Sequence, residues 1–463
     1  MKFAKNIILN SDSYKYSQWP QYPAGTEYVY SYIESRGGKY DKLVFFGLQA
    51  FLREYMSTPV TRAMVDQAEA IMKVHGEPFN REGWDYIVRE HGGILPVEIK
   101  SVDEGSVMYL KNILVSIVNT DPKCYWLTSF LETALLRAIW YPTTVASNSY
   151  RSKEIILDHL ERTGDPSLID FKLHDFGARG VSSLESAALG GMSHLVNFMG
   201  TDTVSGILAA MEYYDADVCG FSIPAMEHST VTSWGRENEV EAYRNMLKLY
   251  GKPGVPVAFV SDSYDIYNAC EHLWGEQLRQ EVIDSQAVVV IRPDSGDPTT
   301  VVNDCLKILD KKFGHTVNSK GFRVLNNVRI IQGDGIDHVS INSILTVMEM
   351  NGYSADNVAF GQGGALLQQN NRDTLEFAMK CSAAMIAGRW IDVYKDPITS
   401  SSKKSKKGRM MLTIDKETGK YVTRPLEFRA ELEDCLKLRW VNGKAYNETT
   451  FEQVRAKSRE GVH

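Results

Sequence analysis

Between residues 150 and 390, short apolar segments alternate with helical patterns, and this alternation limits the possible folds most strongly. Helical patterns lie at 266–283, 299–313 and 338–351. Nearly continuous apolar strands joined by crossover helices are typical of a parallel sheet that is buried on both faces. The apolar segments are "DFKLHDFG" (170–177), "VCGFSIPAMEHS" (218–229), "VPVAFVSDS" (255–263), "AVVVIRPDSG" (287–296), "VRIIQGDG" (328–335) and "NVAFGQGG" (357–364).

Each apolar segment ends in polar residues or glycines. The carboxyl ends of parallel strands share one edge, and in α/β barrels that edge carries the active site. We therefore predict an irregular TIM-like α/β barrel with a site at this edge; an open doubly wound sheet is the alternative. The segment ends are His174 and Asp175, Glu227 and His228, Ser261 and Asp262, Arg292 and Asp294, Gly333 and Asp334, and Gly361, Gly363 and Gly364.

The segments on either side of this region have a different character. Tyrosines at 28, 30 and 32 alternate with other residues and predict a strand that ends near Arg36. Helical patterns over 61–95 and β-type alternation over 96–120 follow. We predict a β-rich α+β domain over 1–150, the barrel over 151–389, and a C-terminal segment, 390–463, that packs on the N-terminal domain and completes it.

The bulk composition excludes several classes of protein. The formal net charge of −7 argues against general nucleic-acid binding, which needs a basic surface. No uncharged apolar run is long enough to span a bilayer, and the first residues do not resemble a signal peptide. The six cysteines form no CxxC pair, and the ten histidines include no HExxH motif. We expect a cytoplasmic enzyme with reduced thiols.

The stretch "KLHDFGARG" (172–180) is a candidate anion site. Arg179 lies between glycines just before a predicted helix, where free amides, the helix dipole and the guanidinium can all favour an anion. Ser182 and Glu185 have the spacing of a capping box for that helix. An ordinary turn with a surface arginine is the alternative interpretation. His174 and Asp175 are interpreted as supports of the turn.

The strand ends together suggest that the site handles phosphate. Arg179 and Arg292 can each clamp phosphate oxygens, and the glycines at 361, 363 and 364 allow backbone amides to approach an anion. Asp262, Asp294 and Asp334 can hold ribose hydroxyls or Mg²⁺. The sequence has no P-loop and no helix-opening GxGxxG. His228 is either a core histidine or a nucleophile or acid–base group.

The ordered motifs resemble the nicotinamide phosphoribosyltransferase family, from "DSYK" near residue 12 to "KKGR" ending at Arg409. The resemblance implies condensation of nicotinamide with phosphoribosyl pyrophosphate to give nicotinamide mononucleotide and pyrophosphate. It also implies Mg²⁺, ATP hydrolysis through a phosphohistidine, and a homodimer with shared active sites. The motifs are "SYIESR", "NTDPKCYWLTSFLET", "FKLHDFGARGVSS", "HLVNFMGTDTV", "PAMEHSTVTSWG", "VSDSYDIYNACEHLWG", "IRPDSGDP", "IQGDGID", "FGQGGALLQ", "NRD" and "YKDP".

The resemblance also implies roles for individual residues. Phe176 would stack on the pyridine ring opposite Tyr14 of the second subunit, and Asp202 would accept a hydrogen bond from the carboxamide. A nicotinate carboxylate would meet a like charge at Asp202. Ser222 is a further expected substrate contact.

The remaining roles concern the phosphoribosyl group and ATP. Phosphate and pyrophosphate would be held by Arg179, Arg292, Gly363 and Gly364, and ribose hydroxyls by Asp294, Gly333 and Asp334. Mg²⁺ would be bound mainly through pyrophosphate, near Asp262. His228, oriented by Glu227, would carry the phosphoryl group, and the second subunit would add Arg36, Arg372 and Lys380. The expected catalytic residues are His228, Asp262, Arg292 and Asp294.

The chain departs from the family pattern at a few places. Ala178 stands where an aromatic residue is expected, Gln369 where a basic residue is usual, and Ala378 where serine is usual. These changes concern peripheral phosphate contacts rather than the reaction. Two rival functions remain at this point: a nicotinate phosphoribosyltransferase, and a non-catalytic binding or signalling protein on the same scaffold.

Overall fold

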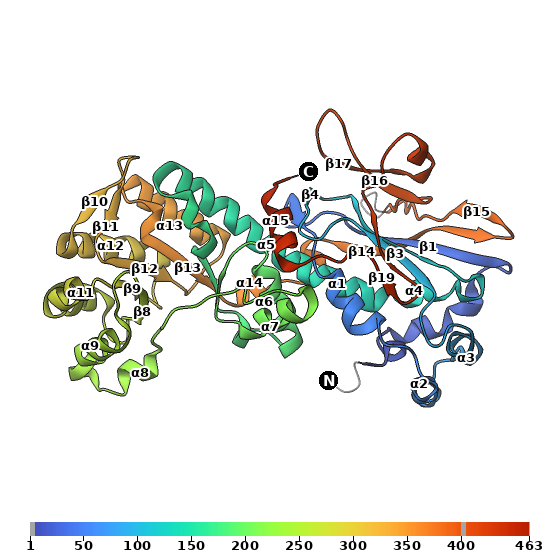
Figure 1. Cartoon of the computed structure of the whole chain (residues 1–463), viewed down its shortest axis with the longest axis horizontal. Helices are drawn as coiled ribbons and strands as arrows, with labels where there is room; N and C mark the ends of the chain where they lie inside the picture. The colour runs from blue at the N-terminus through green and yellow to red at the C-terminus, as the bar shows by residue number, and fades with distance from the viewer. Residues whose placement is uncertain (1–4, 400–403, 463) are drawn as a thin grey trace. The chain divides into compact units, whose positions relative to one another are not determined.

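The computed structural model describes residues 5–399 and 404–462, which form two compact units. The first unit comprises the residues up to Ser147, Ala210–Ala216 and the residues from Asn371 onward, and the second comprises Asn148–Ala209 and Asp217–Asn370. Figure 1 shows both units coloured along the chain. Within the described residues, no helix is both long and apolar enough to cross a membrane.

The first unit is built on a seven-stranded antiparallel sheet. The strand β1 pairs with β14 on one side and β5 on the other, so residues from both ends of the chain share one sheet. The strand order is β15 (Arg389–Asp392), β14 (Phe377–Ile386), β1 (Thr26–Ser35), β5 (Ile113–Asn119), β3 (Val97–Ser101), β18 (Lys437–Val441) and β19 (Lys444–Ala445). The predicted strand ending near Arg36 is confirmed as β1.

Helices and two small ribbons complete the first unit. Its core joins sheet residues such as Ile33 and Ile117 to helix residues such as Trp84 and Leu135. The helices are α1 (Leu48–Phe51), η5 (Leu52–Met56), α2 (Arg62–His75), α3 (Arg81–Glu90), α4 (Leu127–Phe130), the start of α5 (Glu132–Thr163) and α15 (Phe451–Arg459). The ribbons pair β2 (Lys42–Val44) with β4 (Val107–Tyr109) and β16 (Met410–Ile414) with β17 (Tyr421–Pro425).

The boundaries of the two units differ from the expected domain limits at residue 371 and at Ala210–Ala216, which belong to the first unit although they lie within the expected barrel range. The first change of unit lies inside α5, between Ser147 and Asn148, close to the expected position at 150. The return to the first unit comes at Asn371 instead of 390. The reason is that β14 pairs with β1 over its whole length, which places this strand in the first sheet rather than in the barrel.

The second unit contains six parallel strands. Their order is β7 (Gly200–Thr201), β6 (Leu173–Asp175), β13 (Val358–Gln362), β12 (Val328–Gln332), β9 (Val288–Arg292) and β8 (Pro256–Val260). The segment 221–225 connects the two edges, because Phe221 forms a parallel bridge with Gly200 and Ala225 forms one with Ala258. The strands therefore close into a ring, which confirms the barrel and excludes the open sheet.

Helices surround the barrel strands on the outside (Figure 1). Those that contribute to the core around the strands are the end of α5, α8 (His228–Thr232), α9 (Glu239–Tyr250), α10 (Ile266–Asn268), η10 (Ala269–Gln277), α11 (Arg279–Ser285), α12 (Pro298–Phe313) and α13 (His338–Met350). The second unit also contains α6 (Leu184–His194), α14 (Gly364–Leu367) and the first turns of α7 (Val204–Tyr214), whose residues from Ala210 onward belong to the first unit. A short hairpin pairs β10 (His315–Val317) with β11 (Arg323–Leu325). Alternate strand residues face the helices or the barrel interior, where Ala258, Val290 and Ile331 pack together.

A buried lysine lies at the amino end of β6. Lys172 Nζ donates to the carbonyl oxygens of Ala355, Asp356 and Val358, each at 3.0 Å. Burial lowers the pKa of Lys172 to about 8, so at pH 7 the ammonium form, with its three donors, predominates. One side chain thus satisfies three carbonyls where α13 leads into β13.

We expect Lys172→Met to destabilise the protein by at least about 3 kcal/mol, because each buried carbonyl left without a donor costs roughly 1–3 kcal/mol. The matched control is Lys320→Met. Lys320 is exposed, but its Nζ also donates to three carbonyls, those of Leu160, Glu161 and Gly164. Water can replace the exposed ammonium, so the control should lose less than about 1 kcal/mol. Denaturant unfolding measures both, and equal losses would contradict this account.

Candidate active site

The carboxyl ends of β6 and β7 bring a histidine, an aspartate and a serine together. His174 Nε2 lies 2.9 Å from Asp202 Oδ1, and Ser222 Oγ donates to the same oxygen at 2.5 Å. Burial alone would raise the pKa of Asp202, but the hydrogen bonds from His174 and Ser222 and the charge of Arg292 lower it below its usual value. The carboxylate is therefore held in its ionised form at the mouth of the barrel.

Phe176 follows β6, and its ring lies across the end of the barrel. Its amide donates to Gln362 O at 3.0 Å, and its side chain packs against the interior residues. The ring lies so close to β13 that a Cβ atom at position 361 would be 1.9 Å from Phe176 Cε2. A Cβ atom at position 333 would be 2.9 Å away. The two glycines thus leave the space that the ring occupies, and the ring can serve as a flat apolar surface.

Asp175 lies beneath this turn, as expected of a support. It is fully buried, and its Oδ1 accepts a hydrogen bond from the Gly177 amide at 2.7 Å. Burial raises the pKa of Asp175, and the Gly177 hydrogen bond opposes that effect. The residue fixes the backbone between Phe176 and Arg179, and its burial separates it from any substrate at the barrel mouth.

Arg179 lies in the turn η8 (Ala178–Gly180), and its side chain is exposed. The helix α6 begins one residue later than the sequence suggested. Ser183, not Ser182, is the N-cap, and its hydroxyl accepts from the Ser186 amide at 3.0 Å. The predicted capping box at 182 and 185 is therefore wrong. Gly180 faces Gly364, so Arg179 and the start of α14 border the same edge of the barrel.

A second polar cluster surrounds His228 at the ends of β8 and β9. His228 Nε2 lies 3.0 Å from Asp262 Oδ1, and Ser295 Oγ donates to Asp262 Oδ2 at 2.6 Å. The Asp262 side chain is 4% exposed, whereas that of His228 is 44% exposed. His228 Nδ1 lies 3.9 Å from Asp294 Oδ2. Asp262 thus orients the imidazole ring through its contact with Nε2, and the rest of the ring is partly exposed to solvent.

The carboxylates of this cluster repel one another and attract a cation. Burial raises the pKa of Asp294, and the charges of Asp262 and Asp334 raise it further, while Arg292 and His228 oppose them. Arg292 Nη2 lies 3.5 Å from Asp294 Oδ2. Arg292 Nε is buried and has no hydrogen-bond partner within residues 5–399 and 404–462. An anion beside the guanidinium would give Arg292 Nε an acceptor, and a hard divalent cation beside the carboxylates would reduce their mutual repulsion.

The expected contact between Glu227 and His228 is absent from the part of the chain that the structure describes. The Glu227 carboxylate accepts from the Ser229 hydroxyl instead, because Glu227 is the residue just before α8 and its side chain turns toward the first turn of that helix. The prediction that Glu227 orients His228 is therefore wrong, because Asp262 makes the contact with the ring instead.

The other expected barrel residues lie at the same carboxyl edge. Gly333 and Asp334 follow β12, and Asp334 is exposed. Gly363 and Gly364 follow β13 and open α14, where Gly364 O accepts from the amides of Gln368 and Gln369. A Cβ atom at position 364 would meet nothing within 4 Å, so the space beside this backbone is open.

The residues expected from a second subunit all lie in the first unit. Tyr14 is 55% exposed in η3 (Ser13–Ser17), and the neighbouring Lys15 forms an ion pair with Glu132. Lys380 lies in β14, where burial lowers its pKa and Glu132 opposes the effect. Arg36 follows β1, and the exposed Arg372 pairs with Asp373 at 2.9 Å. The four side chains are thus a separate set from the barrel residues.

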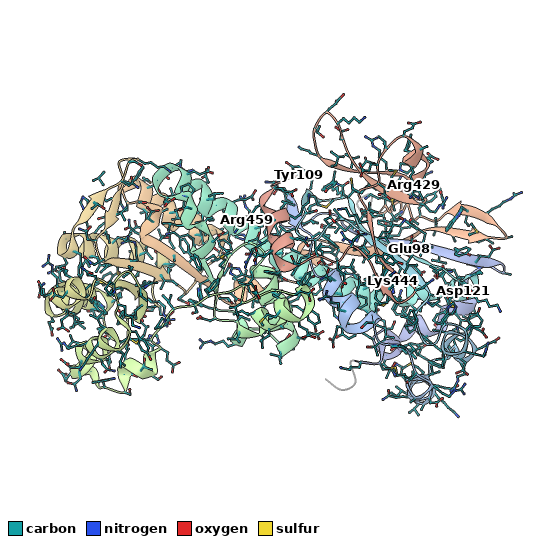
Figure 2. All side chains as sticks on the ribbon, in the orientation of Figure 1. Glu98, Tyr109, Asp121, Arg429, Lys444 and Arg459 are labelled. Carbon is teal, nitrogen blue, oxygen red and sulfur yellow. The ribbon has the colours of Figure 1, made fainter. Side chains whose placement is uncertain are left out.

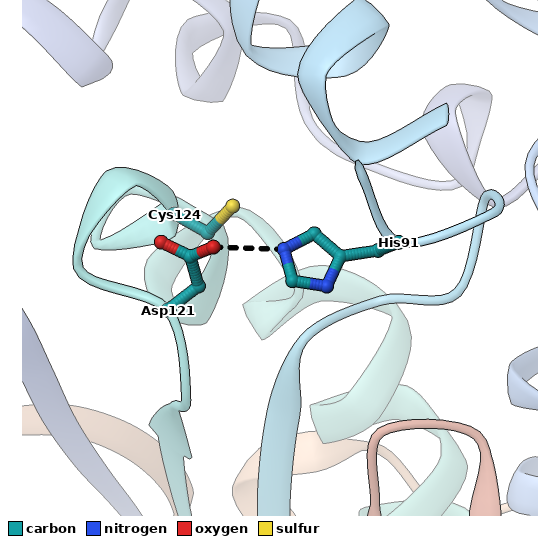
Figure 3. A group of neighbouring side chains, drawn as sticks. All are labelled: His91, Asp121 and Cys124. Atoms are coloured by element: carbon teal, nitrogen blue, oxygen red, sulfur yellow. Dashed lines mark hydrogen bonds and ion pairs between the residues drawn. The ribbon is translucent and has the colours of Figure 1, made fainter. Parts of the chain in front are cut away.

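A further histidine cluster, also in the first unit, has a structural role. His91 Nε2 lies 2.8 Å from Asp121 Oδ2, with Cys124 beside them (Figure 3). Tyr86 Oη donates to Asp121 Oδ2 at 2.9 Å, and the Lys123 amide donates to Oδ1 at 2.8 Å. Burial raises the pKa of Cys124 to about 12. Asp121, labelled in Figure 2, is thus satisfied by hydrogen bonds that join α3 to the turn after β5.

The roles of three residues near the site, Gly361, Ser295 and Gly200, became clear only from the structure. Gly361 had been interpreted as an anion-binding glycine, whereas it provides the space for the Phe176 ring. Ser295 holds Asp262, and Gly200 lies against the His174 ring, where a Cβ atom would be 2.7 Å from Nδ1. The only signal for Ser295 in the sequence was its place beside Asp294, and that for Gly200 was its place two residues before Asp202.

The chain is similar to known proteins over nearly its whole length. The profile of the nicotinate phosphoribosyltransferase (NAPRTase) family matches residues 171–437, and that of the nicotinamide phosphoribosyltransferase N-terminal domain matches residues 6–99. A nicotinamide phosphoribosyltransferase of Xanthomonas campestris pv. campestris is 56% identical over 462 residues, which cover 98% of each chain. One of Acinetobacter baylyi is 30% identical, with 98% of this chain and 97% of that one covered.

Two solved structures share the fold. Nicotinate-nucleotide pyrophosphorylase of Pyrococcus furiosus superposes with a TM-score of 0.65 at 15% identity, covering 98% of this chain and 95% of that one. Human nicotinic acid phosphoribosyltransferase gives 0.58 at 16% identity, with 97% and 93% covered. These likenesses show the arrangement of a barrel with a second α+β unit.

Proposed function

Because the chain belongs to the nicotinate phosphoribosyltransferase family, we propose that it transfers the phosphoribosyl group of 5-phosphoribosyl 1-pyrophosphate to nicotinamide, giving nicotinamide mononucleotide and pyrophosphate in NAD salvage. The observation that carries the choice of nicotinamide is the ionised Asp202, which is hydrogen-bonded to His174, the neighbour of the Phe176 ring. A carboxylate accepts a hydrogen bond from the carboxamide N–H₂ group and repels the carboxylate of nicotinate.

The geometry fits the chemistry of this transfer. Departure of pyrophosphate leaves positive charge on ribose C1′, so the site needs cations on the leaving group and negative groups near the sugar. Arg179 and Arg292 supply guanidinium groups, and the buried Arg292 Nε lacks an acceptor that a phosphate oxygen would provide. Asp294 and Asp334 lie where they can hold ribose hydroxyls. The pyridine nitrogen is already a nucleophile, so little acid–base catalysis is required.

Mg²⁺ fits the carboxylates at the ends of β8, β9 and β12. Burial and the charges of Asp262 and Asp334 raise the pKa of Asp294, and a cation bound there would offset both effects. Oxygen ligands of this kind, together with pyrophosphate oxygens, are those that Mg²⁺ prefers. When bound, the ion would neutralise charge on the leaving group.

His228 is the proposed acceptor of a phosphoryl group from ATP. Its Nε2 faces Asp262, which is an acceptor, so Nε2 carries the hydrogen and Nδ1 is left as the nucleophilic nitrogen. Asp262 can stabilise the positive charge that the ring gains on phosphorylation. ATP hydrolysis would then be coupled to a synthesis that is only weakly favourable by itself.

We expect His228→Ala to abolish the ATP-derived phosphoenzyme while leaving some synthesis of nicotinamide mononucleotide without ATP. Incubation with γ-labelled ATP measures the first, and a product assay measures the second. His315→Ala is the control, because His315 also pairs with an aspartate, Asp310 at 2.6 Å, but lies in β10 away from the barrel mouth. Label that remains on the His228 variant would place the modification elsewhere.

A homodimer with shared active sites is the proposed assembly. The helix α7 exposes Val204, Leu208 and Met211 at 64%, 58% and 42%, and their spacing of four and three places them on one face. An apolar stripe of this kind favours a protein partner. Tyr14, Arg36, Arg372 and Lys380 would enter the site of the second subunit. Sedimentation should give a mass about twice 52.1 kDa.

The proposed location is the cytoplasm, because all six cysteines are free thiols and four of them are buried, as in proteins of a reducing compartment. The activity itself is tested by a product assay with nicotinamide, phosphoribosyl pyrophosphate and Mg²⁺, with and without ATP. We expect nicotinamide mononucleotide in both reactions, more of it with ATP, and none after chelation of Mg²⁺. Absence of the product in every reaction would overturn the proposed function.

A further inference from the structure

His174, which the sequence suggested as a support of the turn, lies beside the proposed nicotinamide site. Its side chain is 14% exposed, and its ring centroid lies 5.2 Å from that of Phe176. Its Nε2 atom is 2.9 Å from Asp202 Oδ1. The ring therefore lies next to the two side chains that the proposed function assigns to the pyridine ring and to the carboxamide.

The backbone of β7 fixes the position of the His174 ring. His174 is paired with Gly200 in the sheet, and the ring lies against that glycine, because a Cβ atom there would be 2.7 Å from Nδ1. Asp202 is fixed independently, since its amide donates to Asp175 O at 3.0 Å. The imidazole and the carboxylate thus come from neighbouring strands with little freedom to separate.

The chemistry of the pair decides where the hydrogens lie. An ionised carboxylate only accepts hydrogen bonds, so His174 Nε2 must carry a hydrogen and donate it to Asp202 Oδ1. Ser222 Oγ donates its hydrogen to the same oxygen. The lone pairs of the hydroxyl oxygen therefore stay free to accept a hydrogen bond from a ligand. Asp202 Oδ2 has no protein hydrogen bond among residues 5–399 and 404–462. Asp202 Oδ2 and Ser222 Oγ are therefore both available as acceptors.

We propose that His174 is a positioning residue that determines amide specificity: by donating to Asp202 Oδ1 it holds the carboxylate so that Oδ2, together with Ser222 Oγ, forms an acceptor-only edge for the two hydrogens of a primary carboxamide. This inference rests on the proposed function. The carboxylate of nicotinate has no hydrogen to donate to either acceptor. Binding of nicotinate would therefore leave both acceptors without a hydrogen bond, and this cost adds to the charge repulsion from Asp202.

The test compares His174→Leu, which removes the donor, with His174→Gln, whose amide N–H₂ can replace Nε2–H. We expect His174→Leu to raise KM for nicotinamide about 10- to 100-fold, as for the loss of a hydrogen bond to a charged group. KM for phosphoribosyl pyrophosphate should change less than about 2-fold, and the preference for nicotinamide over nicotinate should fall at least about 10-fold. His174→Gln should recover most of both losses.

The control is His272→Leu, because His272 is 53% exposed in η10 and also pairs with a carboxylate, Glu276 at 2.9 Å. It should behave as the unmodified protein does. An unchanged substrate preference in His174→Leu, or a Gln variant no better than the Leu variant, would overturn the inference. If the unmodified protein itself makes no nicotinamide mononucleotide, the proposed function fails instead, and that result is separate from the comparison of variants.

Discussion

Gly361→Ala should lower kcat/KM for nicotinamide about 100-fold without unfolding the protein. A methyl group at this position would lie 1.9, 2.3 and 2.7 Å from three carbon atoms of the Phe176 ring, so the ring must move by an ångström or more. A misplacement of that size can cost about 100-fold in rate. Steady-state kinetics with each substrate varied in turn measure the effect, and thermal unfolding verifies that the fold is retained.

Gly364→Ala is the matched comparison, three residues further along the chain, where β13 leads into α14. A methyl group there meets no protein atom within 4 Å, so the protein itself should tolerate it. Because Gly364 is proposed to hold phosphate, this variant should raise KM for phosphoribosyl pyrophosphate and leave KM for nicotinamide nearly unchanged. If Gly361→Ala also affected only the phosphate substrate, the assignment of Phe176 to the pyridine ring would be wrong.

Asp202→Ala should reduce the preference for nicotinamide over nicotinate by about 100-fold. The change removes a hydrogen bond to a charged acceptor, worth about 1.5–3 kcal/mol, and it also removes the repulsion that excludes a carboxylate. Binding of phosphoribosyl pyrophosphate should be largely spared, because the residues proposed for it lie on other strands. The ratio of kcat/KM values for the two pyridines measures the preference.

Asp202→Asn separates the two effects of that change. The asparagine keeps a side-chain oxygen but loses the negative charge, and its amide can donate to a carboxylate. We expect it to use nicotinate better than the alanine variant does. Equal losses for nicotinamide and phosphoribosyl pyrophosphate in either variant would contradict the role given to Asp202.

The sequence predicted the barrel strands well because their physical signal is local. Each is a short apolar run bounded by glycine or polar residues, as in "AVVVIRPDSG", which forms β9 (Val288–Arg292). The closure of the barrel was not predictable in this way. The segment 218–229 was expected as a barrel strand, but its residues 221–225, which include Pro224, join the edges only through two isolated bridges. The edge strand β7, only two residues long, was not predicted.

The boundary near residue 371 was missed for a similar reason. The strand β14 has an apolar pattern that suits either unit, and only its pairing with β1, more than 300 residues away in the chain, decides the matter. Long-range pairing of this kind leaves no local mark on a sequence. Lys172 is another example, since a lysine before a strand gives no sign that three carbonyls surround its amino group.

The site was predicted at the level of residue types and strand ends, but not at the level of contacts. His174 and Asp202 were both named, yet their hydrogen bond depends on the register of β6 and β7. The family resemblance implied that Glu227 orients His228, but side chains at adjacent positions generally point in different directions. The buried Asp262, on the neighbouring strand end, contacts the ring instead.

The most direct test of the proposed activity is a competition between the two pyridines. Equal concentrations of nicotinamide and nicotinate are mixed with limiting phosphoribosyl pyrophosphate and Mg²⁺, and the two mononucleotides are separated and quantified by mass spectrometry. Their ratio equals the ratio of the two kcat/KM values. We predict at least about 100 molecules of nicotinamide mononucleotide for each of nicotinate mononucleotide. A ratio near one, or an excess of nicotinate mononucleotide, would contradict the account.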